Sequence, residues 1–271
     1  MQALFQIDGW DAPFAAVGVA RAEGVLATRG DSAHAVPLAS VSKPVTALAV
    51  LVAAEEGVVD LDGPAGPAGS TVRHLLAHAS GLPFEGTEPI APPGRRRIYS
   101  NEGFRLLGEC LAAGAEMPFA EYVRAAVVGP LGLALDPNGH PGSGMSGSLS
   151  DLLAVGRELL EPTLVAVETH AELVAVQFPG LAGVLPGFGF FSPLDWGLGV
   201  EVKGVKSPHW SGSRTSPGTF GHFGRSGAFL WVDPVAGIAC GCVTTGQFGD
   251  WAREGWPRLS DAVLEELGSP P

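Results

Sequence analysis

Residues 41–56, with the sequence VSKPVTALAVLVAAEE, form the segment that most constrains what this chain can fold into. Their composition predicts a helix that ends at Gly57, because glycine is a common residue just past a helix C-terminus. Apolar side chains occur on nearly all sides of this helix: Val45, Leu48, Val50, Leu51 and Val52. A helix that is apolar all round is normally buried. We therefore expect a central helix with other elements packed around it.

Pro44 limits where this helix can begin, because proline is tolerated only in the first turn of a helix. The helix therefore starts near Ser40, and Lys43 lies one turn on, on the same face. Ser40 would then sit at the positive end of the helix dipole. A serine followed three residues later by lysine is one known way to build an acyl-transfer nucleophile. The pair alone does not distinguish a nucleophile from an ordinary serine near a lysine.

The rest of the chain changes character near residue 180. Two short strands, 13–20 and 24–29, precede the central helix, and a mainly helical region with several loops follows it. Its expected helices cover 71–78, 101–114, 118–128, 148–161 and 163–177. Short β-rich runs come next, among them a hairpin of 227–233 with 236–244, then a helix over about 250–267 and a tail, 268–271, expected to fray.

This order predicts an α+β fold in which the two ends of the chain build one sheet. We expect a sheet domain from residues 1–57 and 180–271, and a mainly helical domain from residues 58–179. The length of 271 residues is sufficient for a substantial core, with 46% hydrophobic and 16% charged residues.

The net charge of −12 argues against nucleic acid or an anionic membrane surface as the main partner. The one basic run, Arg95–Arg97, is interpreted as a solvated loop edge. The N-terminus lacks the pattern of a signal peptide, and no apolar stretch is long enough for a membrane span. Of the three cysteines, Cys110, Cys240 and Cys242, the closely spaced pair Cys240 and Cys242 is interpreted as buried free thiols. These features together predict a cytoplasmic protein.

Two further short motifs are candidates for a site. Tyr99-Ser100-Asn101 opens an apolar helical run. A tyrosine followed two positions later by an asparagine is rarely expected by chance in a chain with two tyrosines and two asparagines. A buried tyrosine with a capping asparagine is the structural alternative. His222-Phe223-Gly224 lies in a predicted strand, where glycine lets a substrate approach the backbone. The similar His140-Pro141-Gly142 is interpreted as a loop, because proline disrupts a central strand.

A metal site is not favoured by the sequence. His74 and His78 are four residues apart, but the glutamate of H-E-x-x-H and a third ligand are missing. Paired carboxylates for glycoside chemistry stay an open alternative, although no spacing singles out a pair. We expect neither a metal nor a cofactor.

The three motifs, at 40–43, 99–101 and 222–224, occur in an order that resembles the serine β-lactamase and penicillin-binding protein superfamily, most closely its class C β-lactamase-related esterase branch. Other matching segments span nearly the whole chain: HLLAHASGLP, PPGRRRIYSNEGFRLLGE, VVGPLGLALDP, and DWGLGVEV through FGHFG. The resemblance implies a β-lactamase/transpeptidase-like fold. In it, helices flank an antiparallel sheet, and the active site lies between the sheet domain and an inserted mainly helical domain.

The resemblance also implies roles for the residues of the first two motifs. Ser40 would be the nucleophile that attacks a carbonyl carbon and forms an acyl-enzyme. Lys43 and Tyr99 would share the proton of Ser40 and return it to the leaving group. Asn101 would hold Lys43 and contact the substrate, and His78 would be structural.

In the third motif, His222 occupies the place of the lysine in K-T-G, Phe223 that of a threonine or serine, and Gly224 that of the glycine. The backbone N–H groups of Ser40 and Arg225 would form the oxyanion hole. Phe223 lacks the hydroxyl that binds a substrate carboxylate. His222 replaces a fixed positive charge with one that we expect to titrate near pH 6–7.

Both replacements weaken recognition of an acidic group, so we predict an esterase or acyl hydrolase acting on small esters or amides. Two alternatives stay open. One is β-lactamase or D,D-peptidase activity, and the other is a catalytically inactive binding protein in which Phe223 fills the cleft. The expected partner is a small-molecule ester, amide or lactam. The sequence is compatible with a monomer and does not fix the oligomeric state.

Overall fold

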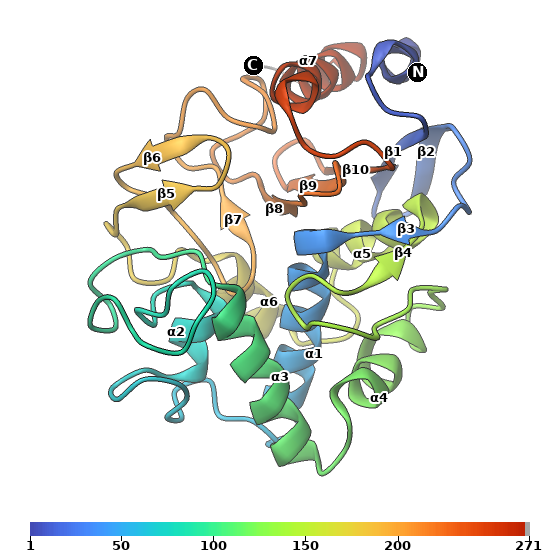
Figure 1. Ribbon diagram of the computed structural model, residues 1–271. Coiled ribbons are helices and arrows are strands. Elements are labelled where there is room, and N and C mark those ends of the chain that lie inside the picture. Colours follow the sequence, from blue (N-terminus) through green and yellow to red (C-terminus); the bar gives the residue numbers. More distant parts are fainter. Residues whose placement is uncertain (269–271) are drawn as a thin grey trace.

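A computed structural model describes residues 1–268, and its centre is a six-stranded antiparallel sheet built from both ends of the chain (Figure 1). The strands in spatial order are β2 (Gly24–Arg29), β1 (Ala15–Arg21), β10 (Ile238–Thr244), β9 (Phe229–Asp233), β8 (Phe220–Phe223) and β7 (Glu201–Val202). The N-terminal strand β1 pairs with the C-terminal strand β10, which joins the two ends of the chain. The predicted hairpin of β9 with β10 is confirmed.

The sheet is a middle layer because side chains alternate between its two faces. On one face, Val17 and Cys242, which are register partners, pack with residues of α7 (Asp250–Glu266) and η1 (Gln2–Gly9). On the other face, Ala16 and Val243 pack with residues of α1 (Ser42–Glu55) and α5 (Leu149–Leu160). In Figure 1, α7 and the N-terminus lie above the sheet, while α1 lies below it.

Helix α1 is the central buried helix that the sequence predicts. It begins at Ser42, directly after the short turn η2 (Ala39–Val41), and the chain leaves it at Gly57 with φ of 74°. Around it lie the following helices of the helical region: α3 (Asn101–Ala115), α4 (Phe119–Val123) and the one-turn π-helix η3 (Arg124–Val128). This packing gives α1 a fixed position, with its N-terminus pointing toward the sheet (Figure 1).

The remaining elements are short. Helices α2 (Val72–Leu76) and α6 (Val167–Val174) belong to the helical region. Two small antiparallel pairs join β3 (Val36–Pro37) to β4 (Ser146–Gly147), and β5 (Gly183–Leu185) to β6 (Gly189–Phe191). Neither these pairs nor η1 is anticipated by the sequence patterns, because strands of two or three residues leave too few positions for an alternating pattern.

The α+β fold is confirmed, but two details differ from the expectations. The stretch 195–202 contributes only a two-residue strand, because Gly199, at φ of 81°, packs its backbone against Ala47 of α1. The helix expected over 163–177 covers only Val167–Val174. The boundaries of the two expected domains stay a prediction, although α5, from the helical part, packs directly on β1 and β10.

One expectation about individual side chains is corrected and one is confirmed. Arg97 is not part of a solvated edge: it is buried, and its guanidinium donates to the backbone carbonyls of Leu194 and Gln177. Cys240 and Cys242 are buried free thiols, as expected, and Cys110 is a free thiol that is partly exposed. Residues 269–271 of the tail expected to fray lie outside the described residues. No helix within residues 1–268 has the length and apolar character that a membrane span requires.

Candidate active site

Ser40 lies in the turn η2, at the bottom of a cavity of about 290 Å³. The side chain of Ser40 is partly exposed, whereas the helix that follows is buried. Residues from all three sequence motifs line this cavity together: Ser40, Tyr99, His222 and Phe223. The tip of the β5–β6 hairpin, residues 185–187, closes one side. The fold therefore brings together segments that are about 60 and 180 residues from Ser40 along the chain.

Lys43 is fully buried next to Ser40, and its surroundings favour a neutral amine. Its Nζ is 2.8 Å from Asn101 Oδ1, 2.8 Å from the carbonyl oxygen of Gly142 and 3.4 Å from Ser40 Oγ. No carboxylate pairs with Lys43 within residues 1–268. Burial therefore lowers the pKa of Lys43 well below its usual value. A neutral amine has two N–H donors and one lone pair. The two carbonyl oxygens accept the N–H groups, which leaves the lone pair for the hydroxyl of Ser40.

Both oxygens that hold Lys43 are themselves held in place. Asn101 is the first residue of α3, whose N-cap, Ser100, accepts a hydrogen bond from the backbone N–H of Gly103 at 2.9 Å. The carbonyl of Pro141, next to Gly142, accepts a hydrogen bond from Thr46 Oγ1 at 2.6 Å. Because Thr46 lies one turn after Lys43, the same helix that carries the amine also fixes the loop above it.

Tyr99 and His222 form a second pair in the cavity. The Tyr99 hydroxyl is 3.4 Å from His222 Nε2, and His222 Nδ1 is 2.7 Å from the backbone carbonyl of Phe223. The carbonyl can only accept, so Nδ1 carries the proton and Nε2 accepts from Tyr99. Burial is the main cause that lowers the pKa of His222, to about 3. Our expectation that His222 titrates near pH 6–7 is therefore wrong.

Tyr99 also stays neutral in this environment. Burial raises the pKa of its hydroxyl. The neutral imidazole of His222 supplies no positive charge that would stabilise a tyrosinate. Of the two residues to which the family resemblance assigns the proton of Ser40, the geometry therefore favours Lys43 as acceptor and Tyr99 as donor.

His78 lies behind Tyr99 and orients the segment that carries it. Its Nδ1 accepts the backbone N–H of Ser100 at 3.1 Å, and its ring contacts those of Tyr99 and Trp196. His74 instead pairs with Thr71, at 2.9 Å between Nδ1 and Oγ1. The two imidazoles thus have separate partners. Within the described part of the chain, no group of three or more His, Cys, Asp or Glu side chains could hold a metal ion.

Phe223 forms a wall of the cavity and does not fill it. Its ring contacts those of Trp210, Phe188 and Phe248, at 5.2 to 5.6 Å between ring centroids. The backbone beyond it approaches the nucleophile closely, since a Cβ on Gly224 would lie 2.5 Å from the carbonyl oxygen of Leu38. Only glycine allows this approach. It brings Arg225 to the same cavity as Ser40, while their oxyanion hole stays a prediction.

Gly142 and Trp196 are site residues that the sequence analysis missed. The segment 140–142 is a loop, as expected, but its last carbonyl binds Lys43. A Cβ on Gly142 would lie 2.8 Å from Phe104 Cβ and 3.2 Å from Lys43 Nζ, so this position also requires a small residue. The H-x-G motif His140-Pro141-Gly142 is the only sequence signal that could have indicated Gly142. Trp196 follows no motif, and only its ring contacts with Tyr99 and His222 reveal it.

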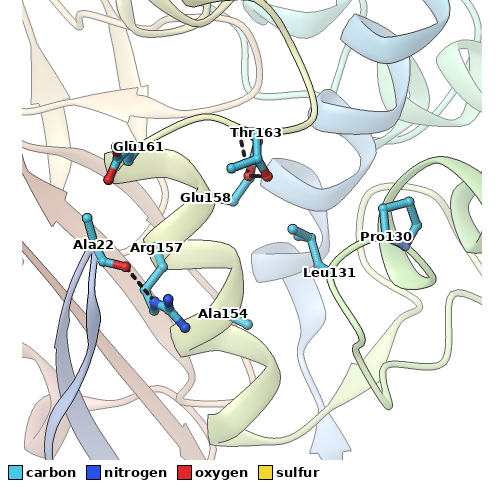
Figure 2. A pocket seen from close by; sticks show the side chains of 8 residues that line it. All are labelled: Ala22, Pro130, Leu131, Ala154, Arg157, Glu158, Glu161 and Thr163. Carbon is cyan, nitrogen blue, oxygen red and sulfur yellow. Dashed lines mark hydrogen bonds between the residues drawn. The ribbon is translucent and has the colours of Figure 1, made fainter.

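A second pocket, of about 260 Å³, lies away from this site beside α5 (Figure 2). Figure 2 shows Arg157 directed at the backbone carbonyl of Ala22, with 2.9 Å between Nε and O. It also shows Glu158 accepting from the hydroxyl of Thr163, at 2.6 Å. These polar groups tether neighbouring segments to α5, so the pocket adds no candidate chemistry.

Comparisons with known proteins agree with this fold. A family model described as Beta-lactamase matches residues 2–136 and 133–265. The crystal structure of a β-lactamase from Mycobacterium bovis is 50% identical, with a TM-score of 0.96 over 98% of this chain and 99% of that one. EstCE1, a hydrolase with promiscuous acyltransferase activity, is 20% identical, with a TM-score of 0.77 over 97% of this chain and 96% of that one. At that identity the likeness shows the fold alone.

A curated relative matches over a shorter stretch. Penicillin-binding protein 4* of Bacillus subtilis (strain 168) is 29% identical over 129 residues, which cover 35% of this chain and 29% of that protein. The chain thus matches less than a third of the length of this relative.

Proposed function

Because this chain belongs to the Beta-lactamase family of serine hydrolases, with its β-lactamase/transpeptidase-like α+β fold, we propose that it is an esterase or acyl hydrolase that forms an acyl-enzyme on Ser40. Its substrates would be small esters or amides. The observation that carries this proposal is the position of Lys43 Nζ, held 2.8 Å from two carbonyl oxygens and 3.4 Å from Ser40 Oγ.

The first step is acylation. The neutral amine of Lys43 accepts the proton of Ser40 Oγ, and the oxygen attacks the substrate carbonyl carbon. The carbonyl π-bond opens to an oxyanion, for which the backbone N–H groups of Ser40 and Arg225 are the proposed donors. The bond to the leaving group then breaks. The proton on Lys43 then passes to the leaving oxygen or nitrogen, either directly or through Tyr99. In the second route the Tyr99 hydroxyl gives its own proton to the leaving group and takes the proton of Lys43 in its place.

The second step is deacylation. A water molecule attacks the acyl-Ser40 carbonyl and gives its proton to Lys43, which returns a proton to Ser40 Oγ as the acid departs. His222 keeps the Tyr99 hydroxyl in position by accepting its hydrogen bond, at 3.4 Å. Asn101 would hold Lys43 and touch the substrate. No step requires a metal or cofactor.

The shape of the cavity supports a small, largely apolar substrate. Its volume of about 290 Å³ is at the low end for ligand sites, and Phe84, Leu185, Phe223 and Phe248 supply apolar walls. Phe223 offers no hydroxyl for a substrate carboxylate, and His222 is neutral at physiological pH. These features support an ester or amide substrate.

Hydrolysis of β-lactams is the second candidate, and two arginines favour it. Arg225 and Arg253 line the cavity, and arginine pairs well with the carboxylate that a β-lactam carries. Rapid turnover of a chromogenic cephalosporin, exceeding that of a neutral ester, would favour this candidate over the esterase.

Hydrolysis of p-nitrophenyl acetate by the wild-type protein and by Ser40→Ala tests the proposal. Ser150→Ala is the matched control, because Ser150 is exposed at the start of α5 and outside the cavity. We expect activity in the wild type and the control and none in Ser40→Ala. Equal or absent activity in all three would overturn the proposal and support the third candidate, a binding protein without catalysis.

A further inference from the structure

A buried charged cluster lies behind the cavity wall, outside the groups that the reaction uses. Its centre is Glu201, at the start of β7. Lys206 Nζ lies 2.9 Å from Glu201 Oε1, and His209 Nε2 lies 2.9 Å from Oε2. Trp210 Nε1 donates to the same Oε2 at 3.0 Å. The side chains of the three ionisable residues are each 1% exposed.

The carboxylate of Glu201 is ionised in spite of its burial. Burial by itself would raise the pKa of Glu201, but His209 and Lys206 together lower it to about 2. A buried carboxylate is stable only when its oxygens are paired in this way. All three donors belong to one connection, residues 203–219, which joins β7 to β8 without regular secondary structure. Glu201 therefore determines how this connection packs.

Trp210 connects this buried cluster to the wall of the cavity. Its ring contacts Phe223 at 5.4 Å and Phe229 at 6.4 Å between centroids, and its exposed fraction is 1%. Phe223 also contacts Phe188, in the turn of the β5–β6 hairpin, at 5.2 Å. The ring of Phe223 thus contacts both an aromatic residue of this hairpin and Trp210. The indole N–H of Trp210 is bound by Glu201, which fixes the orientation of its ring.

We propose that Glu201 is a positioning residue that holds Phe223 in place through Trp210, and that the wall so fixed limits the size of the acyl group. This inference rests on the proposed function, because it assigns the cavity to the acyl group of the substrate. The resulting substrate class is esters of short acyl chains. A longer chain enters only when the wall at Phe223 can yield.

The test uses the full chain with p-nitrophenyl acetate, butyrate and octanoate. Trp210→Phe removes the N–H that Glu201 holds together with one of the two fused rings, and Glu201→Gln removes the charge but keeps the Trp210 ring. The control is Trp10→Phe, since Trp10 packs on Trp251 and does not line the cavity. We expect the octanoate-to-acetate ratio of kcat/KM to rise about fivefold or more in Trp210→Phe through a lower KM, with kcat for acetate within about twofold of wild type.

A purely structural role would lower the rates for all three esters in parallel. A ratio within about twofold of wild type in folded Trp210→Phe overturns the proposal. Glu201→Gln leaves Lys206 without its counter-charge. If Glu201→Gln does not fold for this reason, the result for Trp210→Phe decides. If no ester is hydrolysed with dependence on Ser40, the proposed function fails separately. In that case the melting temperatures of wild type and Trp210→Phe are measured with butyrate and with octanoate. Stabilisation of Trp210→Phe but not of wild type by octanoate supports the inference, and equal shifts in melting temperature overturn it.

Discussion

The three lysines of this chain are all buried, but the groups around two of them differ in a way that separates chemistry from structure. The Nζ of Lys43 donates to the side-chain carbonyl oxygen of Asn101 and to the backbone carbonyl oxygen of Gly142, and it pairs with no carboxylate within residues 1–268. Lys206 forms an ion pair with Glu201. A buried ammonium without a counter-charge tends to lose its proton, whereas a paired one satisfies its partner. Burial alone does not make a base, because the neighbouring groups decide.

Replacing Lys43 gives the largest effect that this comparison predicts. Lys43→Ala removes the proton acceptor, so kcat/KM for p-nitrophenyl acetate should fall by roughly 10³- to 10⁴-fold. The fold should persist, because the lost group holds no counter-charge. Steady-state kinetics and a thermal melt check both statements. Near-normal turnover in the folded variant would remove Lys43 from the mechanism.

Replacing Lys206 should have the opposite profile. Lys206→Met leaves the carboxylate of Glu201 buried with one donor fewer, which should cost about 3 kcal/mol of unfolding free energy. The turnover of the acetate ester per folded molecule should stay within about twofold of wild type, since Lys206 does not line the cavity. Urea denaturation and active-site titration measure the two quantities. A large loss of turnover with unchanged stability would reverse the roles assigned to the two lysines.

Gly142→Ala sharpens the account of Lys43 without removing it. The new Cβ would lie 3.2 Å from Lys43 Nζ and 2.8 Å from Phe104 Cβ, so the carbonyl that holds the amine must shift. We expect a fall in kcat of roughly 10- to 100-fold, since small misplacements of a catalytic group have effects of this order. The matched control is Gly57→Ala, where a Cβ meets no atom within 4 Å, although its φ of 74° lowers stability. Equal kcat in Gly142→Ala and wild type would show that this carbonyl does not position Lys43.

The smallest expected effect per step of the measurement concerns pH. Because the pKa of His222 is lowered to about 3, His222 binds a proton below pH 6.5 in the unfolded chain but not in the folded one. Stability should therefore fall as pH drops from about 6.5 toward 3, by at most about 1.4 kcal/mol per pH unit for one proton. His222→Gln should have a shallower slope than wild type. Unfolding curves between pH 4 and 7 measure it, and identical slopes would indicate that His222 protonates normally.

The sequence predicts the part of the site that is local to one helix. Pro44 sets the start of α1, and the spacing of Ser40 and Lys43 follows from it. The contact of Lys43 with Gly142 joins residues about 100 positions apart, and only the packed fold reveals it. Arg97 looked solvated because its partners are backbone carbonyls of distant segments, which carry no sequence signal. The neutral state of His222 depends on the burial of its ring against Trp196 and Tyr99, which the residues of its motif do not encode.

The protonation state of Lys43 tests the central claim most directly. With three lysines in the chain, ¹³Cε-lysine labelling gives three signals, which Lys43→Ala and Lys206→Met would assign. The account predicts that the Lys43 signal titrates well below the ordinary lysine pKa, so that it is already that of a neutral amine where a solvent-exposed lysine is still an ammonium ion. A Lys43 signal that stays that of an ammonium ion up to pH 10 would contradict it.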